Sequence, residues 1–221
     1  MARKALLVCG ILSSLLYVTS DVLGAMRYQG YSYRSQTISE LCAIGAPTRL
    51  VLLPFYITYD VLVIAFGLGV WASAGEKRAL RFAASLLVGY GVIGFVWPFA
   101  PMHQREVLAM GGGTLTDPMH IILACVTVLL ILFTIGFGAT AFRKQIRVYS
   151  IGTFVILVVF GALTALDGPR LAANLPTPLM GVNERINVFG YMLWVVVLAI
   201  TLLRVREITA SDDFGGSIDS R

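Results

Sequence analysis

The stretch from Gln29 to Arg49, QGYSYRSQTISELCAIGAPTR, is polar and rich in Tyr, Ser and Thr, and it separates two long apolar segments. The first of these segments carries Asp21 near its end, and the second carries Asp60 well inside it. A polar loop between apolar segments of this length is typical of a chain that crosses a membrane repeatedly. We expect the loop to cap a polar cavity at one face of a helical membrane protein.

The composition of the chain supports a membrane location. Of its 221 residues, 57% are hydrophobic and 13% are charged, whereas soluble domains carry roughly 25% charged residues. A soluble fold of this size could not hide so much apolar surface. The net charge of +5 comes without a basic cluster interleaved with aromatic residues, which argues against nucleic-acid binding.

Six segments are long and apolar enough to cross the hydrocarbon as helices. They cover about residues 5–25, 50–74, 80–102, 118–142, 148–168 and 186–204. The sequence therefore predicts an all-α, six-helix membrane domain over residues 1–205, followed by a disordered acidic tail over 206–221. The first segment follows Arg3 and Lys4 as a signal peptide would, but its long apolar run favours an uncleaved helix.

The distribution of basic residues predicts the orientation. With the N-terminus inside, eleven Lys and Arg residues face the cytoplasm and six face outward. The outer six are Arg27, Arg34, Arg49, Arg105, Arg170 and Arg185. This bias predicts that both termini are cytoplasmic.

Acidic residues show the opposite bias. Before the tail there are eight: Asp21, Glu40, Asp60, Glu76, Glu106, Asp117, Asp167 and Glu184. Only Glu76 lies on the predicted inner side. The distribution indicates that any chemistry faces outward.

Asp60 is the least expected of these acids. It lies eleven residues after Arg49, so at 1.5 Å per residue it is about 15 Å deep in the membrane. A carboxylate there costs about 3 kcal/mol or more. Asp60 must therefore face protein or water, be paired, or stay protonated. A functional site and a protonated, structural hydrogen bond both remain open.

The other polar groups also have two interpretations. Spacings of 4, 3, 4 and 3 place Gly10, Ser14, Tyr17, Asp21 and Gly24 on one face of the first helix, where they serve either helix packing or a site.

Pro98 and Pro101 should break the third helix near its outer end, with Trp97 at the interface and His103 beyond it. Asp117 is expected to cap the fourth helix, with Pro118 in its first position.

His120 falls on the same side of the fourth helix as Asp117, where it is either a site residue or an interfacial histidine bonded to the cap. Asp167 with Arg170, and Glu184 with Arg185, are either site residues or weak interfacial ion pairs.

Together these residues predict a candidate site. The predicted catalytic residues are Asp60, Glu40, Asp21, His120 and His103, and the predicted substrate-binding residues are Tyr17, Ser39, Tyr56, Trp97, Asp167 and Glu184. Carboxylates at different depths would have separated pKa values, as acid–base catalysis requires. With two histidines, a three-histidine zinc site within the chain is excluded. A metal site of His103, His120 and an acid stays open, although no HExxH or similar spacing supports it.

The chain shows no motif for a cofactor, and no metal is expected. Its three cysteines, Cys9, Cys42 and Cys125, lack metal-like spacing. They are interpreted as small hydrophobic residues and not as a disulfide.

Four stretches carry a family resemblance: GYSYRSQTISELCAIGAPTR, WPFAPMHQRE, GTLTDPMH and GVNERIN. With Asp21 in the preceding span, they resemble a bacterial membrane-protein family called domain of unknown function 998. The resemblance covers the chain to about Val205 and implies a multi-pass protein of the bacterial cytoplasmic membrane. It brings no established reaction.

We therefore expect a membrane protein whose outward-facing polar cavity binds a lipid-like or hydrophobic small molecule and transforms it by acid–base catalysis, as in a proton-initiated rearrangement or a hydrolysis. The alternatives are a proton-coupled carrier and a lipid-binding or structural accessory protein without catalysis. The expected partners are membrane lipids and the small molecule, and a homodimer is left open.

Overall fold

The computed structural model describes the backbone of residues 1–215 and the side chains of residues 1–204. Within this part, six helices are long and apolar enough to cross a membrane. They are α1 (Ala2–Arg27), α2 (Arg49–Trp71), α3 (Arg78–Gly94), α5 (Thr116–Ala141), α6 (Lys144–Leu166) and α8 (Met180–Gly215). The predicted six-helix membrane architecture is confirmed. The tail predicted to be disordered, 206–221, overlaps the last part of α8, whose backbone continues to Gly215, and residues 216–221 lie outside the described part of the chain. The disorder of the tail stays a prediction.

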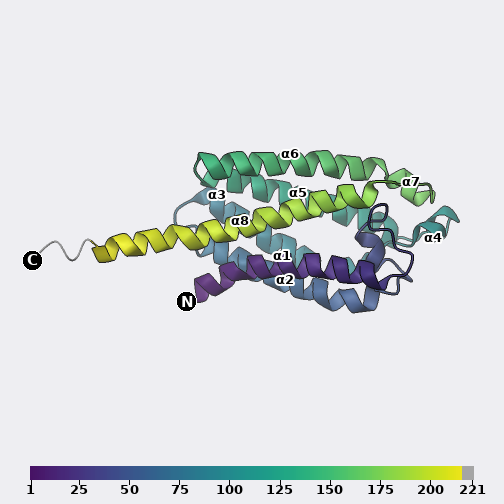
Figure 1. The fold of residues 1–221 in the computed structure, drawn as a ribbon, viewed down its shortest axis with the longest axis horizontal. Helices are drawn as coiled ribbons and strands as arrows, with labels where there is room; N and C mark the ends of the chain where they lie inside the picture. The colour runs from purple at the N-terminus through teal and green to yellow at the C-terminus, as the bar shows by residue number, and fades with distance from the viewer. Residues whose placement is uncertain (216–221) are drawn as a thin grey trace, which may run out of the picture.

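The six long helices form a closed ring. Each packs mainly against two others, in the order α1, α2, α3, α5, α6, α8 and back to α1. Neighbouring helices of the ring run in opposite directions, so that α1 begins at the same end of the ring at which α8 ends, at the left of Figure 1. We call that end the inner end and the opposite one the outer end, after the predicted orientation.

The outer connections contain short helices that the apolar pattern does not predict. They are η1 (Ser39–Cys42), η2 (Trp97–Phe99), α4 (Arg105–Ala109) and α7 (Gly168–Ala172). Figure 1 shows α4 and α7 together at the outer end. As expected, α3 ends before Pro98 and Pro101, since a proline cannot continue the helical hydrogen bonds.

Close packing within the ring depends on small residues. Gly10 on α1 lies against the ring of Phe66 on α2, and Gly24 lies against Leu52. The predicted polar face of α1 is thus a packing face over much of its length, because Gly10, Ser14, Asp21 and Gly24 are all buried. Small residues let membrane helices approach closely and gain dispersion contacts.

The interior of the ring is aromatic and partly polar. Tyr59 and Tyr90 join their hydroxyl groups at 2.8 Å, and the indole N–H of Trp194 donates to Ser150 Oγ at 2.9 Å. In the part of the chain with described side chains, the buried hydroxyls of Tyr56 and Tyr191 have no hydrogen-bond partner. These tyrosines fill the ring with large apolar surfaces that carry a polar end.

Candidate functional site

The loop between α1 and α2, residues 28–48, folds over the outer end of the ring. The Ile44 N–H donates to the Met102 carbonyl at 2.8 Å, which ties the loop to the chain after α3. The Thr48 hydroxyl donates to Leu41 O at 2.6 Å, and the Arg49 guanidinium donates to Cys42 O at 2.7 Å. These bonds satisfy backbone groups that a loop near apolar helices would otherwise leave unpaired.

Asp21 and Arg185 form a buried ion pair beneath this loop. Arg185 Nε and Nη2 donate to the two carboxylate oxygens of Asp21 at 3.0 and 2.8 Å, and both side chains are buried. The pair joins α1 to the start of α8. A two-point arginine–carboxylate contact fixes geometry as well as charge.

Arg185 also holds the loop itself. Its Nη1 donates to the carbonyls of Tyr33, Gln36 and Gly181, and its Nη2 donates to the Tyr31 hydroxyl at 2.7 Å. The guanidinium carbon lies 3.6 Å from the centre of the Tyr33 ring. Every N–H-bearing nitrogen of Arg185 is therefore engaged within the protein, and its charge is balanced by Asp21.

Glu40 and Arg105 form a second two-point pair. Arg105 Nε and Nη2 donate to the Glu40 carboxylate at 2.8 Å each. Glu40 also accepts the backbone N–H of Thr37 at 2.7 Å, and Arg105 Nη1 donates to Thr177 Oγ1 at 3.1 Å. This pair connects η1, α4 and the segment before α8, so Glu40 serves as an anchor of the loop in this structure.

Glu184, Tyr17 and Tyr56 lie near these pairs. The Glu184 carboxylate accepts the backbone N–H of Ile38. The predicted Glu184–Arg185 pair is replaced by this bond and by the Asp21–Arg185 pair. The rings of Tyr17 and Tyr56 lie 5.4 Å apart below, and Ser39 begins η1. The structure thus brings Asp21, Glu40, Glu184, Tyr17, Ser39 and Tyr56 to one end of the ring.

The two histidines belong to a separate group. Asp117 accepts the backbone N–H of His103 at 2.7 Å and contacts its Nδ1 at 2.9 Å. The predicted helix cap at Asp117 is wrong: α5 begins one residue earlier, and the carboxylate accepts the N–H of Thr114, before the helix. His120 Nδ1 donates to Ala100 O at 2.9 Å, and its ring lies 4.9 Å from that of Trp97.

The group that contains the histidines offers no metal site in this structure. In the described part of the chain, no three His, Cys, Asp or Glu side chains lie close enough to hold a metal ion.

Asp60 lies apart from both groups, in the middle of α2. It is 6% exposed, and a methyl group on Gly94 of α3 would collide with its carboxyl group. Among residues 1–204, no hydrogen bond or ion pair involves this carboxyl group. Asp167 belongs to neither group. Its carboxylate lies 3.9 Å from Arg170, in the weak interfacial pair that is one of the two interpretations of these residues from the sequence.

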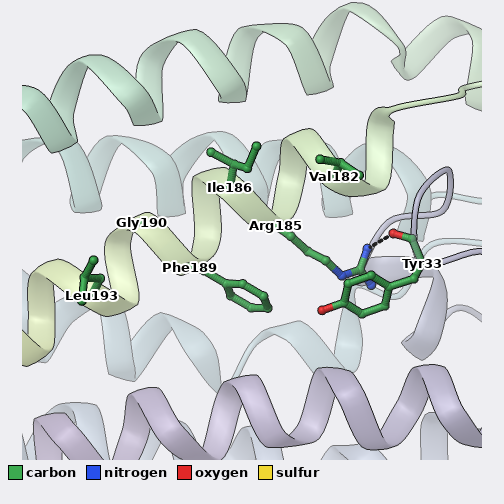
Figure 2. Close-up of a pocket in the computed structure, with 7 residues that line it drawn as sticks. All are labelled: Tyr33, Val182, Arg185, Ile186, Phe189, Gly190 and Leu193. Carbon is green, nitrogen blue, oxygen red and sulfur yellow. Dashed lines mark hydrogen bonds between the residues drawn. The ribbon is translucent and has the colours of Figure 1, made fainter.

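A groove of about 460 Å³ runs along α8 from the loop. It is lined by Tyr33, Val182, Arg185, Ile186, Phe189, Gly190 and Leu193. Figure 2 shows the α8 residues along one stretch of the helix, with Tyr33 beside Arg185 at its outer end. The lining is almost wholly apolar, and Arg185 is the one predicted outer charge that it contains.

Arg185 and Arg105 are absent from the predicted site, although both are central to this end of the molecule. The composition of the chain contains a feature that points to these two arginines. All six basic residues on the predicted outer side are arginines, and the three lysines fall on the inner side. Arginine suits buried two-point pairs better than lysine does, so this bias indicates that the outer charges are structural.

The model of one protein family, "Protein of unknown function (DUF998)", matches residues 11–201. The chain therefore belongs to the DUF998 family, in agreement with the resemblance in its loops. No curated protein and no solved structure matches the chain.

Proposed function

We propose that this member of the DUF998 family is a multi-pass membrane protein that binds a lipid-like or otherwise hydrophobic small molecule along α8. The groove of about 460 Å³ is the observation that carries the proposal. It is an open groove on the outside of the ring, so a ligand in it would be covered by protein on one side. We further propose that the protein resides in a bacterial cytoplasmic membrane with the groove in the outer half of the bilayer.

The shape of the groove favours an elongated ligand. Val182, Ile186, Gly190 and Leu193 are spaced by 4, 4 and 3 residues, so they share one face of α8. At 1.5 Å per residue the stripe is about 16 Å long. Gly190 lies at the edge of this stripe, where a Cβ would meet Leu157 of α6. An alkyl or isoprenoid chain would bury apolar surface over this length.

The chemistry of the outer end favours a neutral polar group on the ligand. Arg185 cannot offer a free charge, because its nitrogens are engaged and Asp21 balances it. Burial, and next the Asp21 carboxylate, raise the pKa of the Tyr33 phenol to about 12. Tyr33 therefore stays neutral near pH 7, and because its hydroxyl is hydrogen-bonded to Asp21, its oxygen can accept a hydrogen bond from a ligand hydroxyl.

Acid–base transformation of the ligand remains a prediction. Asp60, Glu40, His103 and His120 are not among the residues that line the groove. The α8 groove supports the binding of a hydrophobic molecule, but it is apolar and is not the polar cavity that the sequence leads us to expect. Catalysis would need the ligand to reach a different part of the ring.

The test is the amount of lipid-like molecule that co-purifies with the protein, measured by mass spectrometry after extraction. Ile186→Trp should fill the groove and lower retention at least fivefold. The matched control is Ile121→Trp on the lipid-facing side of α5, where Ile121 is 64% exposed against 38% for Ile186. Equal retention by both variants and the unchanged protein would contradict binding in the groove.

A proton-coupled carrier is the second candidate, and Asp60 favours it. A buried carboxyl group without a partner in the middle of a membrane helix is a functional-site hypothesis by default. In liposomes, proton uptake that depends on an added solute should disappear in Asp60→Asn and persist in Asp167→Asn. Uptake that is unchanged in Asp60→Asn would exclude this candidate.

A further inference from the structure

A second groove, of about 400 Å³, lies at the inner end of the ring, opposite the α8 groove. It is lined by Trp71, Arg78, Arg81, Phe82 and Ser85. Trp71 is the last residue of α2, and Arg78 is the first residue of α3. The groove therefore lies on the turn between these two helices, at the depth where the apolar segments meet the surface of the membrane.

The groove carries positive charge from its two arginines, Arg78 and Arg81. No acidic side chain lines it. Within the part of the chain that the structure describes, neither Arg78 nor Arg81 makes a hydrogen bond or an ion pair through its side chain. By contrast, the neighbouring Lys77 is engaged over the ring of Phe142, at 5.8 Å from its centre. Two exposed guanidinium groups three residues apart on a helix share one side of it.

The position of these arginines is unfavourable without a ligand. The first turn of a helix carries partial positive charge and unpaired N–H groups, which favour anions and disfavour cations. Arg78 and Arg81 both fall in the first turn of α3, and no side chain caps it. An anion between the two arginines would offset this local repulsion.

The aromatic residues of the groove indicate which kind of anion it would bind. Trp71 and Phe82 are each at least half exposed, and Phe82 is held in place by stacking on Phe137 with ring centres 5.4 Å apart. Tryptophan prefers the boundary between headgroups and acyl chains. A ligand that meets both the arginines and these rings must be charged at one end and apolar at the other.

We infer that this groove binds the headgroup of an anionic phospholipid, with its phosphate at Arg78 and Arg81 and its acyl chains beside Trp71 and Phe82. Basic pockets between membrane helices on the cytoplasmic side commonly take such headgroups. The inference is independent of the α8 groove, which lies toward the opposite end and whose one charged lining residue, Arg185, is paired with Asp21.

The test is native mass spectrometry of the full chain in detergent, titrated separately with phosphatidylglycerol, phosphatidylcholine and inorganic phosphate. The unchanged protein should retain phosphatidylglycerol in preference to phosphatidylcholine. Each arginine near the surface contributes about fivefold, so R78Q/R81Q should weaken phosphatidylglycerol binding roughly thirtyfold. Phosphatidylcholine binding should stay the same.

The matched control is R143Q/K144Q, which removes the same charge from the other inner turn, outside the groove. It should keep the preference for phosphatidylglycerol. The inference is overturned if R143Q/K144Q weakens binding as much as R78Q/R81Q does, because the effect would then be diffuse surface charge. It is also overturned if inorganic phosphate alone displaces the lipid at equal concentration.

Discussion

At the scale of single residues, the outer acids act first as structural partners. Asp21 and Glu40 each bind an arginine at two points, and both carboxylates are buried. A catalytic acid or base needs a proton that can leave or arrive, whereas these groups are surrounded by fixed donors. Their removal should therefore affect folding before it affects any chemistry.

The Asp21–Arg185 pair can be tested through stability. Removing one member of a buried pair leaves the other charge unpaired, so Asp21→Asn and Arg185→Gln should each lower the free energy of unfolding by about 3–5 kcal/mol. The double variant should lose much less than the sum of the two. Thermal unfolding in detergent measures this cycle.

Arg170→Gln is the control for that cycle, because Arg170 lies at the surface, where it contacts Asp167 at 3.9 Å and donates from Nε to Pro176 O at 2.9 Å. It should cost less than about 1 kcal/mol. If the effects of Asp21→Asn and Arg185→Gln simply add, the pair is not coupled as described.

Cys42 gives a test of how tightly the loop is packed. Burial raises the pKa of its thiol to about 12, against a smaller opposing effect of the Arg49 guanidinium. Since only the thiolate reacts, alkylation by iodoacetamide near pH 8 should be at least about a hundredfold slower than at an exposed cysteine. The comparison is Ser32→Cys with Cys42→Ala, and both proteins should have Cys9 and Cys125 replaced by alanine.

The pH dependence of the two thiols should also differ. The rate at Cys42 should keep rising with pH toward 12, because deprotonation of its buried thiol is the limiting factor. The rate at the exposed cysteine should level off above about pH 9. A Cys42 rate that levels off at the same pH would mean that the loop does not bury the thiol.

At the scale of helices, the contact between α2 and α3 depends on Gly94. A methyl group there would collide with the Asp60 carboxyl group, so Gly94→Ala should destabilise the protein by about 1–3 kcal/mol. Gly89→Ala, on the same helix with open space around it, should be neutral or stabilising by up to about 1 kcal/mol. Thermal unfolding distinguishes the two variants.

Asp60→Ala in the same protein should remove most of the cost of Gly94→Ala, because the side chain that the methyl group meets is then gone. Loss of stability that is the same in both backgrounds would show that Asp60 does not lie against Gly94.

At the scale of the whole molecule, the sequence predicts the helices well and their contacts poorly. Apolar length alone locates the six spans, and Pro98 and Pro101 locate the end of α3. The order of the ring and the partner of each charge depend on three-dimensional contacts. Arg185 lies next to Glu184 in the chain but binds Asp21, 164 residues away. The groove on α8 depends on how α8 sits in the ring, which a residue pattern does not specify.

The orientation of the ring is a further prediction at this scale. Basic residues place the turn around Glu76 in the cytoplasm and the loop around Ser32 outside. In a cysteine-free background and in intact cells, a membrane-impermeant maleimide should label Ser32→Cys and leave Glu76→Cys unlabelled until the cells are lysed. The reverse pattern would invert the orientation and place the α8 groove in the inner half of the bilayer.

The central claim is that a lipid-like molecule occupies the groove along α8, while the polar groups at the outer end hold the loop in place. An experimental density map of the protein purified with its native lipids tests this most directly. We predict elongated density from Tyr33 past Gly190 to Leu193, with its polar end at the Tyr33 hydroxyl. An empty groove, with ligand density against Asp60 between α2 and α3 instead, would contradict the claim.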